Sequence, residues 1–416
     1  MATPSLAMIP SGYKASKVYS VLPENGVGDF NFTRATTAIR INSSGLIETV
    51  ATNVPRLEYP LIDGVVNGCP SLLLEPQRTN LLLQSNQFDT TWTNTNTTVT
   101  SGQVGVGGSS DAWKVDISSA FAQVEQTVSN NGVQTFSVYA KAGTLNWIRL
   151  RVDHTSFSGT YFDLQNGQVG STVGTDSTSI ENLGNGWYRC TIVVDDNVTR
   201  ARIYPASANN DLSATSGNIY IQYAQLEQGS YATSYIPTNG STVTRNAETC
   251  NGAGDSATFN DSEGVLMAEI SALVDDQTRR QISVSDGTVQ NVVRLHYHDT
   301  DSNIIRFQIR SNDIIEVSSS FTVNNIKEFH KVAIFYRLND VKFFIDGFKV
   351  GTDTSAAMPI GLDVLNFDQG NGFQKFYGKT KQIQYYNSAL TDSELETLTS
   401  WTSFSDMANG QQYSII

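Results

Sequence analysis

The side chains of this chain that could do chemistry are mainly aromatic rings in its middle part. Trp92, Tyr161, Tyr188 and Tyr223 carry large rings with a polar edge. The apolar face of a sugar ring stacks on such side chains, and neighbouring polar groups bind the sugar hydroxyls. Threonine and asparagine surround Trp92, so we expect its ring to be exposed. Packing in a core is the alternative for each ring, and these four are the predicted ligand-binding residues.

Two short polar runs have the spacing of weak metal sites. His296 and His298 are two residues apart, so their side chains face the same way on a strand. Asp299, Asp301 and Asn303 have the spacing of part of a calcium loop, but the glycine and the distant glutamate of an EF-hand are missing. We expect a solvent-facing histidine pair followed by a turn with solvated acids.

A catalytic constellation is not visible in the sequence. A retaining glycoside hydrolase needs two carboxyl groups about 5 Å apart. Glu269 stands alone before Asp275 and Asp276, and the GxSxG, HExxH and Walker A motifs do not occur. We therefore expect no enzymatic activity, no catalytic residue and no required cofactor.

The composition favours strands and excludes several classes of partner. Only 16% of the 416 residues are charged, and much of the polarity comes from serine, threonine, asparagine and 32 glycines. That bias suits strands and turns. A net charge of −13 disfavours nucleic acid and an anionic membrane surface, because phosphate groups need a basic face. No apolar run approaches the roughly 18 residues of a membrane-spanning helix, so we expect no membrane insertion.

The three cysteines, Cys69, Cys190 and Cys250, are too few and too far apart for a disulfide framework or a zinc site. The first residues lack the basic and apolar regions of a secretory signal. We expect assembly in a reducing cytoplasm.

Alternation of polar and apolar residues predicts strands through most of the chain. The segments TFSVYAKA, WIRLRVDH, NGWYRCTIVV and NIYIQYAQLEQ are separated by short turns, which is the pattern of an all-β sandwich. Asn166-Gly167 predicts one hairpin turn and the run from Asn42 to Gly45 predicts another. The predicted fold class is all-β, with tandem antiparallel sandwiches of the jelly-roll type.

The segment from Val341 to Leu398 carries two stronger local signals. Asp346-Gly347 between two apolar runs predicts a tight hairpin, because glycine accepts the positive φ of such a turn. Thr391, followed three residues later by Glu394, predicts the capping box of a short closing helix.

A chain of this length exceeds one hydrophobic core. We divide it into residues 1–80, 81–247 and 248–416. The first unit has little apolar mass, so we expect it to complete its core against a partner chain or a neighbouring domain. The second and third units are each predicted to be a sandwich.

The ordered motifs resemble two known families. The hairpin, strand and capped helix of the last unit resemble the laminin-G-like, concanavalin A-like sandwich. The strings NLLLQSNQFDTTWT, TFSVYAKAG, GNGWYRCTIVV and AQLEQGSYATSYIPT resemble the carbohydrate-binding-module-like jelly roll of bacteriophage fibre and spike proteins. The earlier string LEPQRTNLL resembles the lead-in of such virion proteins.

The resemblance implies a structural protein of the virion surface, assembled in the host cytoplasm. Residues 1–80 would be an extended anchor on capsid or tail proteins, and the sandwiches would face host-surface glycans. Such a protein would be a head or tail fibre or a capsid decoration, and a homotrimer. Related sandwiches often hold a structural calcium ion, for which Glu75, Asp89 and Glu227 lie in segments that could converge. A decoration without a ligand and a polysaccharide depolymerase are the alternatives.

Overall fold

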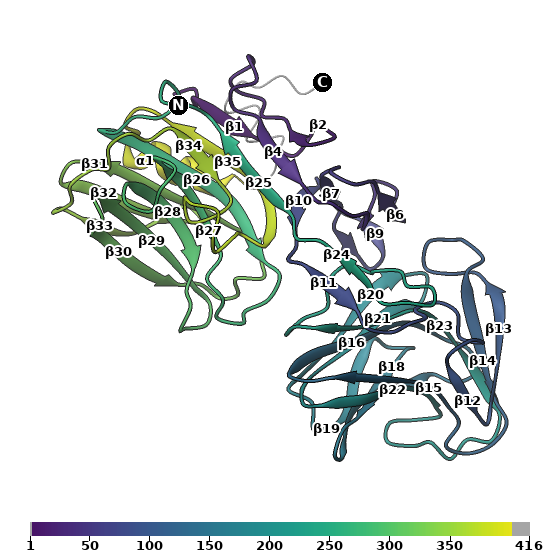
Figure 1. Ribbon diagram of the computed structural model, residues 1–416. Helices are drawn as coiled ribbons and strands as arrows, with labels where there is room; N and C mark the ends of the chain where they lie inside the picture. The colour runs from purple at the N-terminus through teal and green to yellow at the C-terminus, as the bar shows by residue number, and fades with distance from the viewer. Residues whose placement is uncertain (1, 402–416) are drawn as a thin grey trace.

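The computed structural model describes residues 2–401 and consists of two antiparallel β-sandwiches with one short helix. Figure 1 shows the two sandwiches as separate layered bodies, with strands of the N-terminal segment between them. The predicted all-β class with tandem sandwiches is confirmed. The helix has nine residues, and no helix in residues 2–401 has the length and apolar character needed to span a membrane.

The middle sandwich is built from two six-stranded sheets. The first sheet has the order β12 (Thr93–Thr95), β15 (Gln123–Asn130), β22 (Val198–Ala206), β17 (Trp147–Asp153), β18 (Phe157–Asp163) and β19 (Gln168–Val173). The second sheet has the order β13 (Thr97–Gln103), β14 (Ala112–Ile117), β23 (Gly217–Gln228), β16 (Val133–Ala142), β21 (Trp187–Asp195) and β20 (Ser177–Gly184).

Strict alternation in these strands separates a core face from an outer face. On β17, Ile148, Leu150 and Val152 are fully buried in the core between the sheets. The residues between them face outward, because successive side chains of a strand point to opposite sides. The sequence pattern of β17 therefore decides which of its side chains can meet a ligand.

The C-terminal sandwich has an eight-stranded and a nine-stranded sheet. The smaller sheet has the order β33 (Phe348–Asp353), β32 (Asp340–Ile345), β31 (His330–Arg337), β26 (Glu263–Ala272), β35 (Gly378–Tyr386), β10 (Ser71–Leu74) and β7 (Arg56–Glu58), with β1 (Leu6–Met8) also paired to β35. The larger sheet has the order β2 (Tyr13–Lys14), β3 (Lys17–Val18), β4 (Phe30–Thr33), β25 (Thr249–Ala253), β34 (Val364–Asn366), β27 (Gln281–Ser285), β28 (Val292–Tyr297), β29 (Ile304–Ser311) and β30 (Ile314–Thr322).

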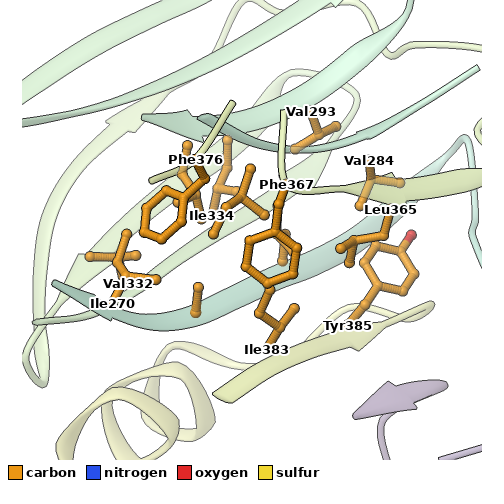
Figure 2. Close-up of a cluster of buried hydrophobic side chains, with 14 of the residues drawn as sticks. Ile270, Val284, Val293, Val332, Ile334, Leu365, Phe367, Phe376, Ile383 and Tyr385 are labelled. Carbon is orange, nitrogen blue, oxygen red and sulfur yellow. The ribbon is translucent and has the colours of Figure 1, made fainter. Parts of the chain in front are cut away.

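The core of this sandwich is a continuous apolar layer between the two sheets. Figure 2 shows Ile383 and Tyr385 of β35 facing Val284 and Val293 of the opposite sheet, with Phe367 between them. All five side chains are almost completely buried. Burial of this apolar surface is the main stabilising contribution to the sandwich.

Both sheets of the C-terminal sandwich are completed by strands from the start of the chain. Leu6 pairs with Tyr385, Leu72 pairs with Thr380, and Cys250 pairs with Phe32. The first segment therefore buries its apolar side chains in the core of a neighbouring domain of the same chain. The anchoring role of residues 1–80 stays a prediction.

Three two-stranded ribbons lie outside the large sheets. They are β5 (Ala38–Ile41) with β6 (Ile47–Val50), β8 (Leu61–Ile62) with β9 (Val65–Val66), and β11 (Arg78–Asn80) with β24 (Val243–Arg245). Figure 1 shows β6 and β9 between the two sandwiches, and β11 and β24 as the two connecting segments.

The predicted turns and helix cap are confirmed. Asp346 and Gly347 both have positive φ and join β32 to β33. The predicted turns after Asn42 and at Asn166-Gly167 join β5 to β6 and β18 to β19. The helix α1 (Asp392–Ser400) begins after Thr391. The Thr391 side chain accepts a hydrogen bond from the backbone N–H of Glu394, and the Glu394 side chain accepts one from the backbone N–H of Thr391.

Candidate functional site

The outer face of the first middle sheet concentrates arginine and aromatic side chains. Arg149 lies at the centre of β17, directly opposite Tyr161 on β18 and Tyr204 on β22. We call the outward side chains of these three strands the arginine–aromatic face; they are Trp147, Arg149, Arg151, Phe157, Tyr161, Arg202 and Tyr204.

The guanidinium group of Arg149 lies among three aromatic rings. Its Cζ atom is 5.1 Å from the centre of the Tyr161 ring, 5.2 Å from that of Phe157 and 5.9 Å from that of Tyr204. These distances are those of cation–π contacts, which hold a guanidinium group in place. Burial raises the pKa of the Tyr161 phenol, and the charge of Arg149 opposes that rise.

The neighbouring arginines of this face are neutralised by carboxylates. Arg202 lies 2.7 Å from an oxygen of Asp153 and 3.0 Å from an oxygen of Glu125. Arg151 also pairs with Asp153, at 2.7 Å. Within residues 2–401, Arg149 forms no ion pair with a carboxylate, and its Nε has no hydrogen-bond partner. The face therefore presents one guanidinium group, fixed by aromatic rings, that has no carboxylate partner among residues 2–401 and whose Nε donor is free of a hydrogen bond.

A half-buried indole ring lies at the end of this face. Trp147 is two residues before Arg149 on β17, so both side chains point outward. A Cβ atom at Gly170 would lie 2.6 Å from the Trp147 ring and 2.6 Å from the amide oxygen of Asn209. The glycine thus lets the indole and an exposed amide approach each other, which places an aromatic surface beside a hydrogen-bonding group.

The predicted calcium ligands do not form a calcium site. The Glu75 carboxylate lies 2.8 Å from Arg56 and 2.9 Å from Arg245, and it accepts a hydrogen bond from the Ser234 hydroxyl. Burial raises the pKa of Glu75, but Arg245 and Arg56 outweigh burial and hold that pKa well below its usual range. Glu75 is therefore an anion that already has its counter-charges.

The other two predicted ligands also have different surroundings. Glu227 accepts hydrogen bonds from the backbone and side chain of Thr233, the neighbour of Ser234. Glu75 and Glu227 thus converge on one dipeptide, but Asp89 is an exposed loop residue. No group of three His, Cys, Asp or Glu side chains suited to a metal ion occurs among the described residues. The prediction was wrong because arginines, which cannot be read from carboxylate spacing, occupy the site.

Glu248 extends the same buried network. It lies 2.7 Å from Arg34 and also pairs with Arg56, and its carboxylate accepts the backbone N–H of Glu75. The cluster contains three guanidinium groups, from Arg34, Arg56 and Arg245, and two carboxylates, from Glu75 and Glu248. It ties the first segment to the segment that links the two sandwiches.

The expectation that Trp92 is exposed is wrong. Its side chain is 5% exposed, its ring centre is 5.2 Å from that of Phe88, and its Nε1 donates to the backbone oxygen of Gln84. The polar neighbours of Trp92 point to solvent, but the loop turns the ring into the core. The polarity of the neighbouring residues in the sequence therefore does not predict the direction in which a single side chain of a loop points.

The other predicted aromatic residues occupy three different places. Tyr161 belongs to the arginine–aromatic face but is 5% exposed under Arg149. Tyr188 is half-buried against the core, close to Gly167. Tyr223 stacks on Tyr235 with ring centres 4.2 Å apart, and its hydroxyl donates to Asp111. The structure therefore does not bring the four predicted residues together.

The histidine pair is buried, contrary to expectation. His296 and His298 are 2% and 6% exposed, and burial lowers the pKa of His296 to about 3. Loop residues after Phe367 approach the outer face of β28, where Arg294 Nη1 reaches the backbone oxygen of Gln369. In the acidic run that follows, Asp299 pairs with Arg279.

Sequence reasoning missed two residues, Arg149 and Arg189. Arg149 could have been found, because the alternation in WIRLRVD places it on the same side as Trp147. Arg189 carries no such signal, since its neighbours Ser137 and Thr233 lie 52 and 44 residues away in the chain.

One known protein family matches the sequence of the C-terminal sandwich. The profile of the family described as "Concanavalin A-like lectin/glucanases superfamily" matches residues 251–396. These residues lie inside the predicted third unit, and the laminin-G-like, concanavalin A-like fold of this part is shown. Among curated proteins, no sequence matches the chain.

Several solved structures match parts of the chain at low identity and with low TM-scores. A Ruminococcus gnavus IT-sialidase CBM40 bound to α2,3-sialyllactose is 18% identical, with a TM-score of 0.31, covering 36% of this chain and 94% of that one. Domain 4 of AbnA, a GH43 extracellular arabinanase from Geobacillus stearothermophilus, in complex with arabinotriose, is 12% identical, with a TM-score of 0.31, covering 42% and 84%. Mouse laminin alpha1 chain, domains LG4-5, is 9% identical, with a TM-score of 0.25, covering 82% and 96%. TM-scores this low support no conclusion about either fold or function.

Proposed function

We propose that this protein is a non-catalytic attachment protein that binds glycans through the arginine–aromatic face of its middle sandwich. The carrying observation is Arg149, held among three aromatic rings and without a carboxylate partner in residues 2–401. A fixed guanidinium group offers several N–H donors to the oxygens of a sugar, and ring contacts reduce the entropy lost on binding. Trp147 supplies the adjacent apolar surface.

The biological setting in this proposal is a bacteriophage particle. The protein is a head or tail fibre or a capsid decoration, its first residues attach to capsid or tail proteins, and it acts as a homotrimer. The support for this setting is the resemblance of the motifs in residues 74–248 to virion fibre and spike proteins. Weak binding at one site becomes useful in such a setting, because several copies on one particle raise the effective concentration.

The test is binding of the full chain to a glycan array, followed by titration of the best glycan. Arg149→Gln should weaken binding about tenfold or more, as expected for the loss of a charged hydrogen bond. Arg337→Gln is the matched control, because Arg337 is a half-exposed arginine of β31 in the C-terminal sandwich, outside the arginine–aromatic face. Equal binding by both variants, with unchanged melting temperatures, would show that Arg149 does not contact the glycan.

A structural decoration without a ligand is the second candidate. The buried network around Glu75 and Glu248 favours it, because these contacts join the first segment to both connecting segments as a spacer would require. Absence of binding by the assembled oligomer to every glycan on the array would favour this candidate. Release of reducing ends from a host polysaccharide would instead indicate the depolymerase alternative.

A further inference from the structure

A cavity of about 350 Å³ lies where the first segment meets both sandwiches. Its walls come from the β5–β6 ribbon, from β20 and β21 of the middle sandwich, from residues 231–235, and from β26 and β35 of the C-terminal sandwich. Figure 1 shows β6 and β7 in this region, between the two bodies. Small-molecule sites are often found at such junctions, and this volume is within their range.

Arg189 is a buried cation in the wall of this cavity. It is 8% exposed, its Nη2 donates to the Ser137 hydroxyl at 3.1 Å and to the Thr233 backbone oxygen at 2.7 Å, and its Nε has no hydrogen-bond partner. Its guanidinium carbon is 5.4 Å from the centre of the Tyr139 ring. Burying a charge that has no opposite charge in contact costs free energy. An arginine buried in this way in a cavity wall is therefore a candidate for binding an anionic ligand.

No carboxylate in the described part of the chain forms an ion pair with Arg189. Glu181 is its strand neighbour on β20, but the Glu181 side chain is exposed and makes no such contact. The buried arginines of the nearby network differ in this respect, since Arg56 and Arg245 each have a carboxylate partner within 3 Å. Arg189 therefore has no carboxylate in direct contact, although Glu227, Glu181 and Glu75 stabilise its charge from a distance.

The remaining charged residues of the cavity wall are of both signs, with the carboxylates Glu58 and Glu181 beside two lysines. Lys379 and Lys327 also line the cavity, and neither makes an ion pair with a residue between 2 and 401. Glu75 is already neutralised by its arginines, and Arg40 is paired with Glu48 at 3.1 Å. The aromatic and apolar part of the wall includes Tyr139, Tyr231, Tyr235 and Leu183.

We propose that this cavity is a second binding site, for a sugar-sized ligand that carries a carboxylate. The carboxylate would contact Arg189 and Lys379, and the body of an acidic monosaccharide unit would lie against Tyr139 and Tyr235. Recognition of a carboxylate by a guanidinium group is strong and directional. The site lies on the opposite sheet of the middle sandwich from the arginine–aromatic face, so it does not rest on the proposed function.

The experiment is a calorimetric titration of the full chain with glucuronate and, in parallel, with glucose, which lacks the carboxylate. Glucuronate should bind and glucose should bind at least about tenfold more weakly. Arg189→Gln should weaken glucuronate binding about tenfold or more, and Lys379→Gln several-fold. Arg337→Gln, a change to an exposed arginine outside the cavity, should leave binding unchanged.

Lys379→Gln keeps the proposal testable if Arg189→Gln does not fold, because Lys379 is a half-buried residue of the cavity wall that forms no ion pair within residues 2–401. Equal binding of the two sugars would overturn the proposal. Unchanged glucuronate binding by a folded Arg189→Gln or by Lys379→Gln would do the same. Loss of binding with Arg149→Gln alone would place the carboxylate on the other face.

Discussion

Two buried arginines at the junction of the sandwiches differ in their counter-charges. Arg56 lies between Glu75 and Glu248 and is fully buried with them. Arg189 has only neutral acceptors and one aromatic ring. An arginine that is paired with carboxylates stabilises the fold. An arginine in a cavity wall without a carboxylate in contact is better explained as a group that binds a ligand.

The first prediction at this scale concerns the paired cluster. Glu75→Gln leaves Arg56 and Arg245 with less compensation, so it should lower the free energy of unfolding by about 3–5 kcal/mol at neutral pH. Urea unfolding at pH 7 measures the change. The control is Glu48→Gln, which removes a partly exposed pair with Arg40 and should cost under about 1 kcal/mol. Equal effects of the two changes would contradict this account of the cluster.

The second residue-scale prediction concerns Glu58 in the cavity wall. Burial raises the pKa of Glu58 to about 7, with Lys379 and Arg56 opposing that rise and Glu75 adding to it. Glu58 is therefore partly neutral below pH 7 and becomes an anion as the pH rises through its pKa. A bound carboxylate should be repelled by that anion, so glucuronate affinity should be higher at pH 6 than at pH 8.

Calorimetric titration at the two pH values measures this difference. Glu58→Gln should flatten the dependence, since glutamine stays neutral and keeps an oxygen to accept the backbone N–H of Ile41. A dependence that persists unchanged in Glu58→Gln would assign it to another group.

At the scale of single elements, the β32–β33 hairpin was predictable because its turn chemistry is local. Asp346 also has a role that the sequence did not reveal. Its carboxylate contacts His330 Nδ1 at 2.6 Å and accepts the backbone N–H of Lys331 at 2.8 Å. The hydrogen bond to Asp346 raises the pKa of His330, partly against the effect of burial.

This pair should make the stability of the hairpin depend on pH. The folded pKa of His330 is raised, so the added stability is present below the unfolded value of about 6.5 and is lost as the pH rises through the folded value. Asp346→Asn should therefore reduce stability at pH 5.5 by up to about 1 kcal/mol, because Asp346 is partly exposed.

At pH 9 the same change should have almost no effect, since asparagine accepts the Lys331 N–H and tolerates positive φ. Thermal unfolding at the two pH values tests the prediction. A larger loss at pH 9 than at pH 5.5 would show that the sign is wrong.

At the scale of the whole molecule, the first segment joins the two sandwiches. Its Asp63-Gly64 turn touches the β20–β21 turn so closely that a Cβ atom at Gly184 would lie 2.6 Å from the Gly64 Cα. Gly184 and Gly186 both have positive φ, so alanine is strained at both positions. Only Gly184 contacts the first segment, because the nearest atom to a Cβ at Gly186 is in Lys141, at 3.4 Å.

Comparison of Gly184→Ala with Gly186→Ala should therefore isolate this contact. The Gly184 variant should show faster amide hydrogen exchange in residues 61–66, and the Gly186 variant should not. Similar exchange in the two variants would show that the contact contributes little to the junction.

The strand pairing also predicts which fragments can fold. Residues 248–416 alone lack β1, β7 and β10 in one sheet and β2, β3 and β4 in the other. That fragment should be unfolded or aggregated, since it exposes sheet edges and core side chains such as Leu266 and Ile383. Residues 78–247 contain all strands of the middle sandwich and should unfold cooperatively. Circular dichroism with thermal melting compares the fragments, and a cooperative transition of 248–416 near that of the full chain would contradict the prediction.

The sequence by itself determined the fold class, the hairpins and the capped helix, because alternation, turn residues and capping depend on neighbours in the chain. It also fixed which side of β17 carries Trp147 and Arg149. Only the tertiary structure decided that Trp92 turns inward, that arginines neutralise Glu75, and that no carboxylate of the described residues contacts Arg189. The physical reason is that the burial and the charge environment of a side chain are set by segments distant in sequence. For Arg189 these are β16 and the segment around Thr233, while the first segment and the C-terminal sandwich close the rest of the cavity.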